Sequence, residues 1–276
     1  MTLHTALLQG TKLLEEAGVS VPRLTAEVLL SHAIRRDRVY LYAHPEEELT
    51  ELGWIHYGRY LHERIAGKPT QYITKRQEFY GREFIVGPDV LIPRPETEHL
   101  VETAIAKIRP GDLVLDVGVG SGAIAVTLAL ETSARVFATD ISQPALRVAA
   151  ANARLLKADV TLLAADLASC MRRGSIDVLV SNPPYVPQTD RPALQREVRD
   201  YEPHIALFAG PSGLDVYERL TEQARTVLRR GGWLLLELGY NSLEPVRELL
   251  SGDWVDIEVR SDLAGIPRVI EAKRRS

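Results

Sequence analysis

The spacing of hydrophobic residues in the first third of the chain is that of helices. Apolar residues recur there every three or four positions, as they do along one face of a helix. One such stripe is Ala26, Leu29, Leu30 and Ala33. It follows Pro22 closely, and proline is favoured in the first turn of a helix.

A second stripe of the same kind consists of Trp54, Tyr57, Leu61 and Ile65. Thr50 before it can serve as an N-cap, and Gly67 after it can serve as a C-cap. A further, less regular helix is predicted over residues 3–16. These short amphipathic segments predict a small helical bundle. Nothing in residues 1–66 carries chemistry of its own, which favours a packing or docking module.

Near residue 70 the pattern changes from helical to strand-like. Residues 78–86 contain two short β-prone runs on either side of Gly81, which predicts a hairpin. This hairpin would link the helical bundle to the rest of the chain. Residues 96–107 then have a helical pattern again.

From residue 112 onward apolar strands alternate with helices. Strands are predicted over residues 113–115, 135–139, 160–163, 177–181 and 233–238, and helices over 123–130, 144–157 and 215–229. This alternation is typical of an α/β fold with a parallel sheet covered on both faces. The runs at 255–259 and 268–271 are too close together for a crossover helix, so we expect an antiparallel pair at the sheet edge.

Composition and charge exclude several classes of protein. Of the 276 residues, 45% are hydrophobic and 25% are charged, the ordinary balance of a soluble globular protein of one or two domains. The formal net charge of −4 argues against a protein held on nucleic acid by bulk electrostatics. Cys170 is the only cysteine and no two histidines are spaced as a helical metal site, so we expect no metal. No apolar run could span a bilayer and the N-terminus lacks a signal core, so we expect a cytoplasmic protein without a membrane partner.

A glycine-rich turn follows the first strand of this alternating region. In an open parallel sheet, ligands bind at the carboxyl ends of the strands. The run from Asp116 to Gly122 reads DVGVGSG, and its glycines let backbone approach a ligand closely. Gly118, Gly120 and Ala123 also fit the dinucleotide-binding pattern, so the turn alone leaves the cofactor open. Asp116 would repel a pyrophosphate but suits a cationic ammonium, such as that of S-adenosylmethionine.

Asp140 ends the second strand of the region. An acidic side chain at this place can accept hydrogen bonds from both ribose hydroxyls of a nucleoside. Sites for NAD and for S-adenosylmethionine share this feature, so Asp140 predicts a nucleoside without distinguishing the two.

The fourth strand ends in Ser181 and the run Asn182-Pro183-Pro184-Tyr185. The prolines lack N–H groups and stiffen the turn, which leaves the Pro183 carbonyl as an acceptor beside the Asn182 side chain. Two acceptors and an aromatic ring suit a flat group that carries an NH2.

Together, these motifs resemble those of Rossmann-like methyltransferases that modify planar nitrogens. The LIPRPETE run at residues 91–98 narrows the resemblance to the bacterial release factor glutamine methyltransferases. The QYI and EFYG runs before it, residues 202–203 and residues 264–269 are also similar to that family. Val119 and Lys75 depart from its usual Thr and Gly.

The resemblance implies an enzyme that transfers a methyl group from S-adenosyl-L-methionine to the side-chain amide of the glutamine in the Gly-Gly-Gln motif of peptide chain release factors. It implies a helical substrate-docking domain (residues 1–74), a β-hairpin linker (75–92) and a class I methyltransferase domain (93–276) with a mostly parallel seven-stranded sheet. We expect a cytoplasmic monomer whose partners are release factors, with no stable nucleic acid.

The resemblance also assigns site residues individually. The cofactor-binding set is Asp116, Gly118, Val119, Gly120, Ser121, Gly122, Asp140, Ile141, Asp166, Leu167 and Asn182. The catalytic set is Asn182, Pro183 and Tyr185, and the substrate-binding set adds Pro184, Arg94 and Glu202. Asn182 and the Pro183 carbonyl would take the amide hydrogens of the glutamine, and Tyr185 would pack on its plane.

Three alternative functions stay open at this point. An adenine-N6 methyltransferase for DNA or RNA would use the same NPPY run, but the net charge and the lack of a basic stretch longer than residues 273–275 weigh against it. An NAD-dependent oxidoreductase would leave Asp116 and NPPY unexplained. A non-catalytic cofactor-binding protein would not need the intact NPPY run.

Overall fold

The computed structural model describes all 276 residues, and the contacts within it divide the chain into two units. The first unit comprises residues 1–76 and 195–201, and the second comprises residues 77–194 and 202–276. Each unit has a hydrophobic core of its own. No helix is long and apolar enough to cross a membrane.

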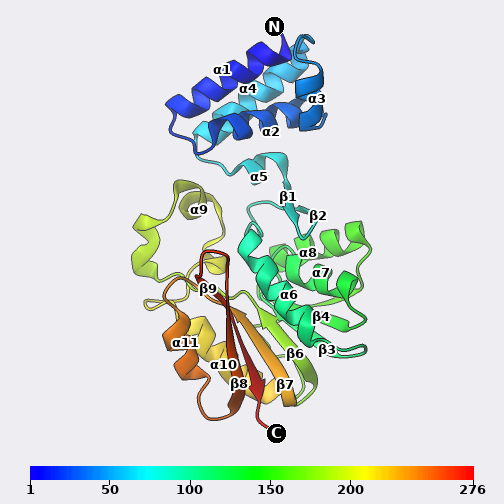
Figure 1. Ribbon diagram of the computed structural model, residues 1–276, viewed down its shortest axis with the longest axis vertical. Coiled ribbons are helices and arrows are strands. Elements are labelled where there is room, and N and C mark those ends of the chain that lie inside the picture. Colours follow the sequence, from blue (N-terminus) through cyan, green and yellow to red (C-terminus); the bar gives the residue numbers. More distant parts are fainter. The chain divides into compact units, whose positions relative to one another are not determined.

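Five helices make up most of the first unit (Figure 1). They are α1 (Leu3–Glu16), α2 (Pro22–Ile34), α3 (Arg38–Ala43), α4 (Glu51–Ile65) and α5 (Thr70–Thr74). The three long helices α1, α2 and α4 pack on one another around buried leucines and Tyr57. Thr50 caps α4 as predicted, because its Oγ1 accepts a hydrogen bond from the Gly53 backbone N–H at 3.1 Å. The helical bundle is thereby confirmed.

The predicted buried face of α4 is wrong at its two ends. Tyr57 and Leu61 are buried, but Trp54 and Ile65 are 39% and 36% exposed. At 3.6 residues per turn these two positions lie to one side of Tyr57, whereas Tyr60 and Arg64 lie on the other side and are buried. The predicted face was chosen from the apolar residues alone and therefore did not include the buried Arg64.

A short helix from much later in the chain belongs to this first unit. α9 (Arg196–Tyr201) contacts the end of α4 and the turn after it. The Arg64 guanidinium pairs with the Glu197 carboxylate at 2.5 Å, and the Tyr201 hydroxyl donates to the Ala66 carbonyl at 3.1 Å. The ion pair gives the buried Arg64 a charged partner, which a guanidinium away from water requires.

The second unit opens with a two-stranded hairpin and contains a seven-stranded sheet. The hairpin pairs β1 (Arg76–Phe79) with β2 (Arg82–Ile85). The sheet consists of β3 (Leu113–Val117), β4 (Arg135–Asp140), β5 (Val160–Ala164), β6 (Ile176–Ser181), β7 (Leu228–Glu237), β8 (Trp254–Ser261) and β9 (Pro267–Arg274). Their order is β5-β4-β3-β6-β7-β9-β8, and only β9 runs antiparallel to both of its neighbours. The mostly parallel sheet and the antiparallel β8–β9 pair are both confirmed.

Helices cover both faces of this sheet, as the strand–helix alternation predicts (Figure 1). On one face lie α6 (Glu98–Lys107), α7 (Ala123–Glu131) and α8 (Gln143–Leu156), and on the other lie α10 (Asp215–Val227) and α11 (Leu243–Leu249). β3 shows why the strands read as continuous apolar runs, since Val114 packs in one core and Leu115 in the other. The helix predicted over 215–229 ends at Val227, because Leu228 already pairs with Ile176 in the sheet.

Three shorter 3-10 turns complete the second unit. They are η1 (Pro95–Thr97), η2 (Gln188–Ala193) and η3 (His204–Ala206). The last two lie in the long segment between β6 and α10, for which the sequence predicted no regular structure.

Asn152 on α8 ties the hairpin to the glycine-rich turn. Its side chain is completely buried and makes three hydrogen bonds. Oδ1 accepts from the Ile85 N–H at 2.7 Å, and Nδ2 donates to the carbonyls of Ile85 and Ser121 at 2.9 and 2.8 Å. One side chain thus holds β2 and the turn after β3 in fixed positions.

We expect replacement of Asn152 by alanine to lower the free energy of unfolding by about 3 kcal/mol, because three buried backbone groups lose their partner. Urea unfolding followed by circular dichroism would measure the loss. Arg154→Ala, at an exposed position of the same helix, is the control and should change stability by less than about 0.5 kcal/mol. Equal stability of the two variants would contradict the assigned role of Asn152.

Candidate functional site

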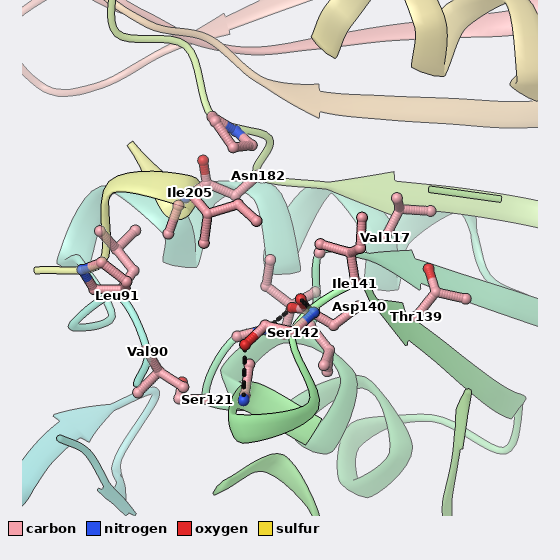
Figure 2. A pocket seen from close by; sticks show the side chains of 18 of the residues that line it. Val90, Leu91, Val117, Ser121, Thr139, Asp140, Ile141, Ser142, Asn182 and Ile205 are labelled. Carbon is pink, nitrogen blue, oxygen red and sulfur yellow. Dashed lines mark hydrogen bonds between the residues drawn. The ribbon is translucent and has the colours of Figure 1, made fainter. Parts of the chain in front are cut away.

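A pocket opens at the carboxyl ends of β3, β4 and β6, where the strand order reverses (Figure 2). The chain continues from β3 to β4 on one side and returns to β6 on the other, which leaves a crevice between them. The cavity has a volume of about 290 Å³. Its lining side chains come from segments within residues 89–97, 117–124, 139–145, 165–167, 182–184, 203–208 and 216–219, all of them in the second unit.

The glycine-rich turn forms one wall of the pocket. Gly118, Val119, Gly120 and Ser121 line it, whereas Gly122 does not. Gly122 has φ of +87°, and a Cβ there would lie 3.3 Å from the Ala149 backbone. Glycine at this position therefore allows α7 and α8 to pack closely, while the preceding residues present their backbone to the pocket.

Asp116 lies beneath this turn and is not among the lining residues. It is completely buried, and its Oδ2 accepts a hydrogen bond from the Ala125 N–H at 3.1 Å. Its Oδ1 has no hydrogen-bond partner. Burial away from water raises the pKa of this carboxyl to about 8, and the nearby Asp140 charge adds to the effect. A contact with a cofactor ammonium stays a prediction for Asp116.

Asp140 lines the pocket next to Ser142, as Figure 2 shows. Two backbone amides hold its carboxylate, since Oδ1 accepts from Ser142 N–H at 2.8 Å and Oδ2 accepts from Gly120 N–H at 3.0 Å. This side chain therefore joins the turn after β4 to the glycine-rich turn. Ile141 beside it also lines the pocket and is 58% exposed. The structure thus brings these predicted cofactor residues together.

Asp166 and Leu167 follow β5 and line the far end of the pocket. Asp166 pairs with the guanidinium of Arg219, which projects from α10 and also lines the cavity. Sequence reasoning missed Arg219. No local signal marks it, because an arginine on the polar face of a helix has many ordinary uses.

The NPPY run begins directly after β6. The Ser181 hydroxyl donates to the Val117 carbonyl at 2.6 Å, which ties the ends of β6 and β3 together. Asn182 and Pro184 line the pocket, and the Asn182 Nδ2 donates to the Thr97 hydroxyl at 3.2 Å. The turn thereby reaches the same cavity as the glycine-rich turn.

Pro183 and Tyr185 are not among the lining residues. Pro183 is buried, and Tyr185 packs against the backbone of Gly239, where a Cβ would lie only 2.5 Å from the ring. Burial raises the pKa of Tyr185 to about 12, so its hydroxyl stays protonated. The catalytic roles of both residues stay predictions.

Arg94 and Glu202 form an ion pair beside the pocket. Arg94 lines the cavity, while Glu202 is 3% exposed and also accepts a hydrogen bond from the Ile92 N–H at 3.3 Å. Glu202 thus anchors the segment that carries Arg94 and does not itself line the pocket.

One carboxyl group beside the pocket was missed by the sequence analysis. Glu237 ends β7, is 3% exposed and lies next to Thr97 and Asn182. Burial raises its pKa to about 7, while hydrogen bonding from Thr97 and Asn182 acts in the opposite direction. Its position at the carboxyl end of a parallel strand is the signal that could have identified it.

Two apolar segments contribute to the lining of the pocket. Val90 and Leu91 lie on one side, and Ile205 and Phe208 lie on the other. Figure 2 shows Leu91 and Ile205 near Asn182. Sequence reasoning did not assign these four residues to the site. No group of three or more His, Cys, Asp or Glu side chains is arranged to hold a metal ion.

Known protein families match both parts of the chain. Residues 5–74 match the PrmC N-terminal domain, and residues 96–199 match the Methyltransferase small domain. A solved structure, a methyltransferase from Pyrococcus furiosus, has a TM-score of 0.55 with 18% identity, over 75% of this chain and 94% of that chain. At this identity the likeness is one of fold, and it agrees with the fold class predicted from the sequence.

Curated relatives extend over the whole chain. The release factor glutamine methyltransferase of Koribacter versatilis (strain Ellin345) is 47% identical over 279 residues, which cover 99% of this chain and 99% of that protein. The enzyme of the same name from Moorella thermoacetica is 44% identical over 282 residues, which cover 100% of this chain and 99% of that protein. The resemblance that rested on a few motifs is thereby confirmed. Because identity of this degree spans both units, the chain belongs to the family of release factor glutamine methyltransferases.

Proposed function

We propose that this protein transfers a methyl group from S-adenosyl-L-methionine to the side-chain amide nitrogen of the glutamine in the Gly-Gly-Gln motif of peptide chain release factors. The observation that carries the proposal is that Asn182 and Pro184 line the same pocket as the glycine-rich turn and Asp140. Relatives at up to 47% identity over the full chain bear the corresponding name, which supports it.

The residues around the pocket fit S-adenosylmethionine. The glycine-rich turn offers close backbone approach for the methionine part, and Asp140 offers a carboxylate for the ribose hydroxyls. Ile141 and Leu167 provide apolar surface for a flat base, and Asp166 provides an acceptor at its edge. Asp116 has one buried oxygen that lacks a partner, and a cationic group of the cofactor nearby would favour the ionised form of this carboxyl. When bound, S-adenosylmethionine supplies a methyl group on a positively charged sulfur, which needs no further activation.

The protein's own contribution is alignment of the amide. An amide nitrogen is a poor nucleophile because its lone pair is delocalised, so its orientation in a dry site matters. The Asn182 side-chain oxygen and the Pro183 carbonyl would accept the two N–H groups of the glutamine amide. The two prolines add no competing donors. The apolar lining residues Val90, Leu91 and Phe208 would help to keep the site dry.

A methyl-transfer assay tests the proposed function. The protein would be incubated with tritiated S-adenosylmethionine and one candidate substrate at a time. The substrates are a release factor, the same factor with Gln→Ala in its Gly-Gly-Gln motif, and double-stranded DNA or RNA. Tritium in the unmodified release factor, and in none of the other substrates, supports the proposal. Label in nucleic acid would favour the adenine-N6 alternative, for which no specific observation in the structure speaks.

We further propose that residues 1–74 dock the release factor and that the enzyme works as a monomer in the cytoplasm, with no stable nucleic acid partner. α4 carries two exposed apolar residues, Leu52 and Ile55, at 66% and 59% exposure. Their spacing puts them on one face of the helix. An unpaired apolar pair of this kind suits contact with a protein.

We expect the double variant Leu52→Lys and Ile55→Lys to raise the KM for the release factor about thirtyfold, because two apolar contacts of about 1 kcal/mol each would be lost from the interface. The Kd for S-adenosylmethionine should not change. Steady-state kinetics and calorimetry would measure the two constants. Glu51→Lys, at an adjacent exposed position, controls for the added charge. An unchanged KM would reject α4 as the docking helix.

A further inference from the structure

We infer that Glu237 and Thr97 are positioning residues that hold the Asn182 amide in one orientation through a chain of hydrogen bonds. The inference rests on the proposed function, since it assigns Asn182 the task of holding the substrate amide. Neither residue carries an assigned role in catalysis.

The first link of the chain is the bond between Asn182 and Thr97. The Asn182 Nδ2 donates to the Thr97 Oγ1 at 3.2 Å. An Asn side chain has one end that donates and one end that accepts, and the two can exchange by a flip. With Nδ2 held by Thr97, the Oδ1 is the end that remains for the substrate. That oxygen is the acceptor that an amide N–H requires.

The second link runs from Thr97 to Glu237. A hydroxyl that accepts from Asn182 still has its own O–H to donate, and Thr97 is 4% exposed, so water does not readily serve it. The Glu237 carboxyl lies beside it, and hydrogen bonding from Thr97 and from Asn182 favours the ionised form of that carboxyl. Its Oε2 is buried without a hydrogen-bond partner, so it is an acceptor that the Thr97 hydroxyl can serve. In the inferred chain Thr97 donates to this buried acceptor of Glu237, and that direction makes Thr97 the acceptor from Asn182.

The backbone that carries Glu237 is itself held rigidly. The Tyr217 hydroxyl donates to the Glu237 carbonyl at 2.7 Å and accepts from the Gly239 N–H at 3.2 Å. The Leu238 N–H donates to the Arg268 carbonyl at 2.8 Å. Tyr217 is completely buried. The backbone from which the Glu237 carboxyl projects is therefore held in place by hydrogen bonds on both sides of the residue.

Glu237 is buried beside the pocket, and burial of a carboxylate away from water costs free energy unless the group is paired. A buried carboxyl in a stable core is ordinarily paired with a cation. The groups that face Glu237 are Thr97 and Glu96 of η1, Asn182 and Tyr185 of the NPPY run, Arg268 of β9 and Tyr217 of α10. Arg268 lowers its pKa and Glu96 raises it, but Arg268 bonds to Asp262 at 2.8 Å. The nearest polar partners of Glu237 are thus those of the site.

Two pairs of variants of the full-length enzyme test the inference. Thr97→Val is compared with Thr97→Ser, and Glu237→Ala is compared with Glu237→Gln. We expect Thr97→Val and Glu237→Ala to lower kcat about tenfold to thirtyfold, because the Asn182 amide can then flip. Serine keeps the hydroxyl and glutamine keeps an acceptor, so each should stay within about threefold of the wild type. KM for the release factor and Kd for S-adenosylmethionine should change little in all four variants.

A double variant and a pH profile separate positioning from general weakening of the fold. If the residues act as one chain, Thr97→Val with Glu237→Ala should lose little more than either alone. The wild-type kcat should fall as the pH drops below about 7, where Glu237 takes up a proton and can reverse the hydrogen bond. Glu237→Gln should lack this step.

Glu271→Gln is the matched control, since Glu271 is also a fully buried glutamate and does not line the pocket. It should leave kcat and its pH dependence unchanged. Full turnover of Thr97→Val, or additive losses in the double variant, would overturn the inference. A wild-type enzyme that methylates no release factor would instead refute the proposed function, so the two failures are distinguishable.

Discussion

Replacement of Asn182 by alanine should lower the rate of methyl transfer about a thousandfold and leave cofactor affinity within about threefold of the wild type. Asn182 lies between the two halves of the pocket, with its Nδ2 bonded to Thr97 and its other end directed at the cavity. The variant removes one of the two acceptors that we propose orient the substrate amide. It leaves in place Asp140 and the glycine-rich turn, which are predicted to carry most contacts of the cofactor.

Single-turnover transfer of tritiated methyl to a release factor would measure the rate, and calorimetric titration with S-adenosylmethionine would measure the affinity. Gln188→Ala is the control, because it removes an exposed amide from the same segment of the chain. Turnover of Asn182→Ala equal to that of the control would remove Asn182 from the mechanism. Loss of cofactor binding in parallel with turnover would reassign it as a cofactor residue only.

Those parts of the fold that depend on local signals are predictable from the sequence. The glycine-rich turn joins β3 to α7 because Gly118 and Gly120 adopt positive φ, which other residues rarely do. Thr50 and Ser142 cap helices through their own side chains, and each lies next to the residues it serves. The alternation of apolar strands with helices then implies a parallel sheet with its ligands at the carboxyl ends.

What the sequence leaves undetermined depends on contacts between distant residues. Arg219 enters the pocket because it pairs with Asp166, and Glu237 approaches Asn182 because β7 lies beside β6. β9 takes its place between β7 and β8 by pairing with both, although it follows them in the chain. α9 joins the first unit through the Arg64–Glu197 pair, which no local pattern records. Such pairs require knowledge of which strands and helices are neighbours.

The same distinction explains the uneven outcome for the predicted site residues. Asp140 ends β4, whereas Asn182 and the turn residues from Gly118 to Ser121 come after β6 and β3, and all of them line the pocket. Asp116 and Glu202 do not line the pocket. The Asp116 carboxyl accepts from the Ala125 N–H, and Glu202 pairs with Arg94. A motif identifies the residues near a strand end, but the direction of each side chain depends on the pleat and on packing.

Replacement of Asp140 by alanine should weaken S-adenosylmethionine binding about a hundredfold, which is the reverse of the pattern expected for Asn182. Two hydrogen bonds from ribose hydroxyls to a carboxylate contribute about 3 kcal/mol together, and tenfold in Kd corresponds to about 1.4 kcal/mol. The variant also releases the Gly120 and Ser142 amides that the carboxylate now holds, so the turn becomes less ordered before the cofactor binds.

Calorimetry would give Kd, and saturating cofactor would separate binding from chemistry. At saturation we expect kcat of Asp140→Ala to recover to within about fivefold of the wild type, because Asp140 does not touch the substrate amide. Asp140→Asn keeps an acceptor for the Gly120 N–H and removes only the negative charge. Its Kd for S-adenosylmethionine should therefore lie between those of the wild type and Asp140→Ala. Asp159→Ala, at a position outside the pocket, is the control for loss of an acidic group. An Asp140→Ala enzyme that binds the cofactor normally but turns over slowly would contradict this division of labour, because the carboxylate would then act on the reacting amide.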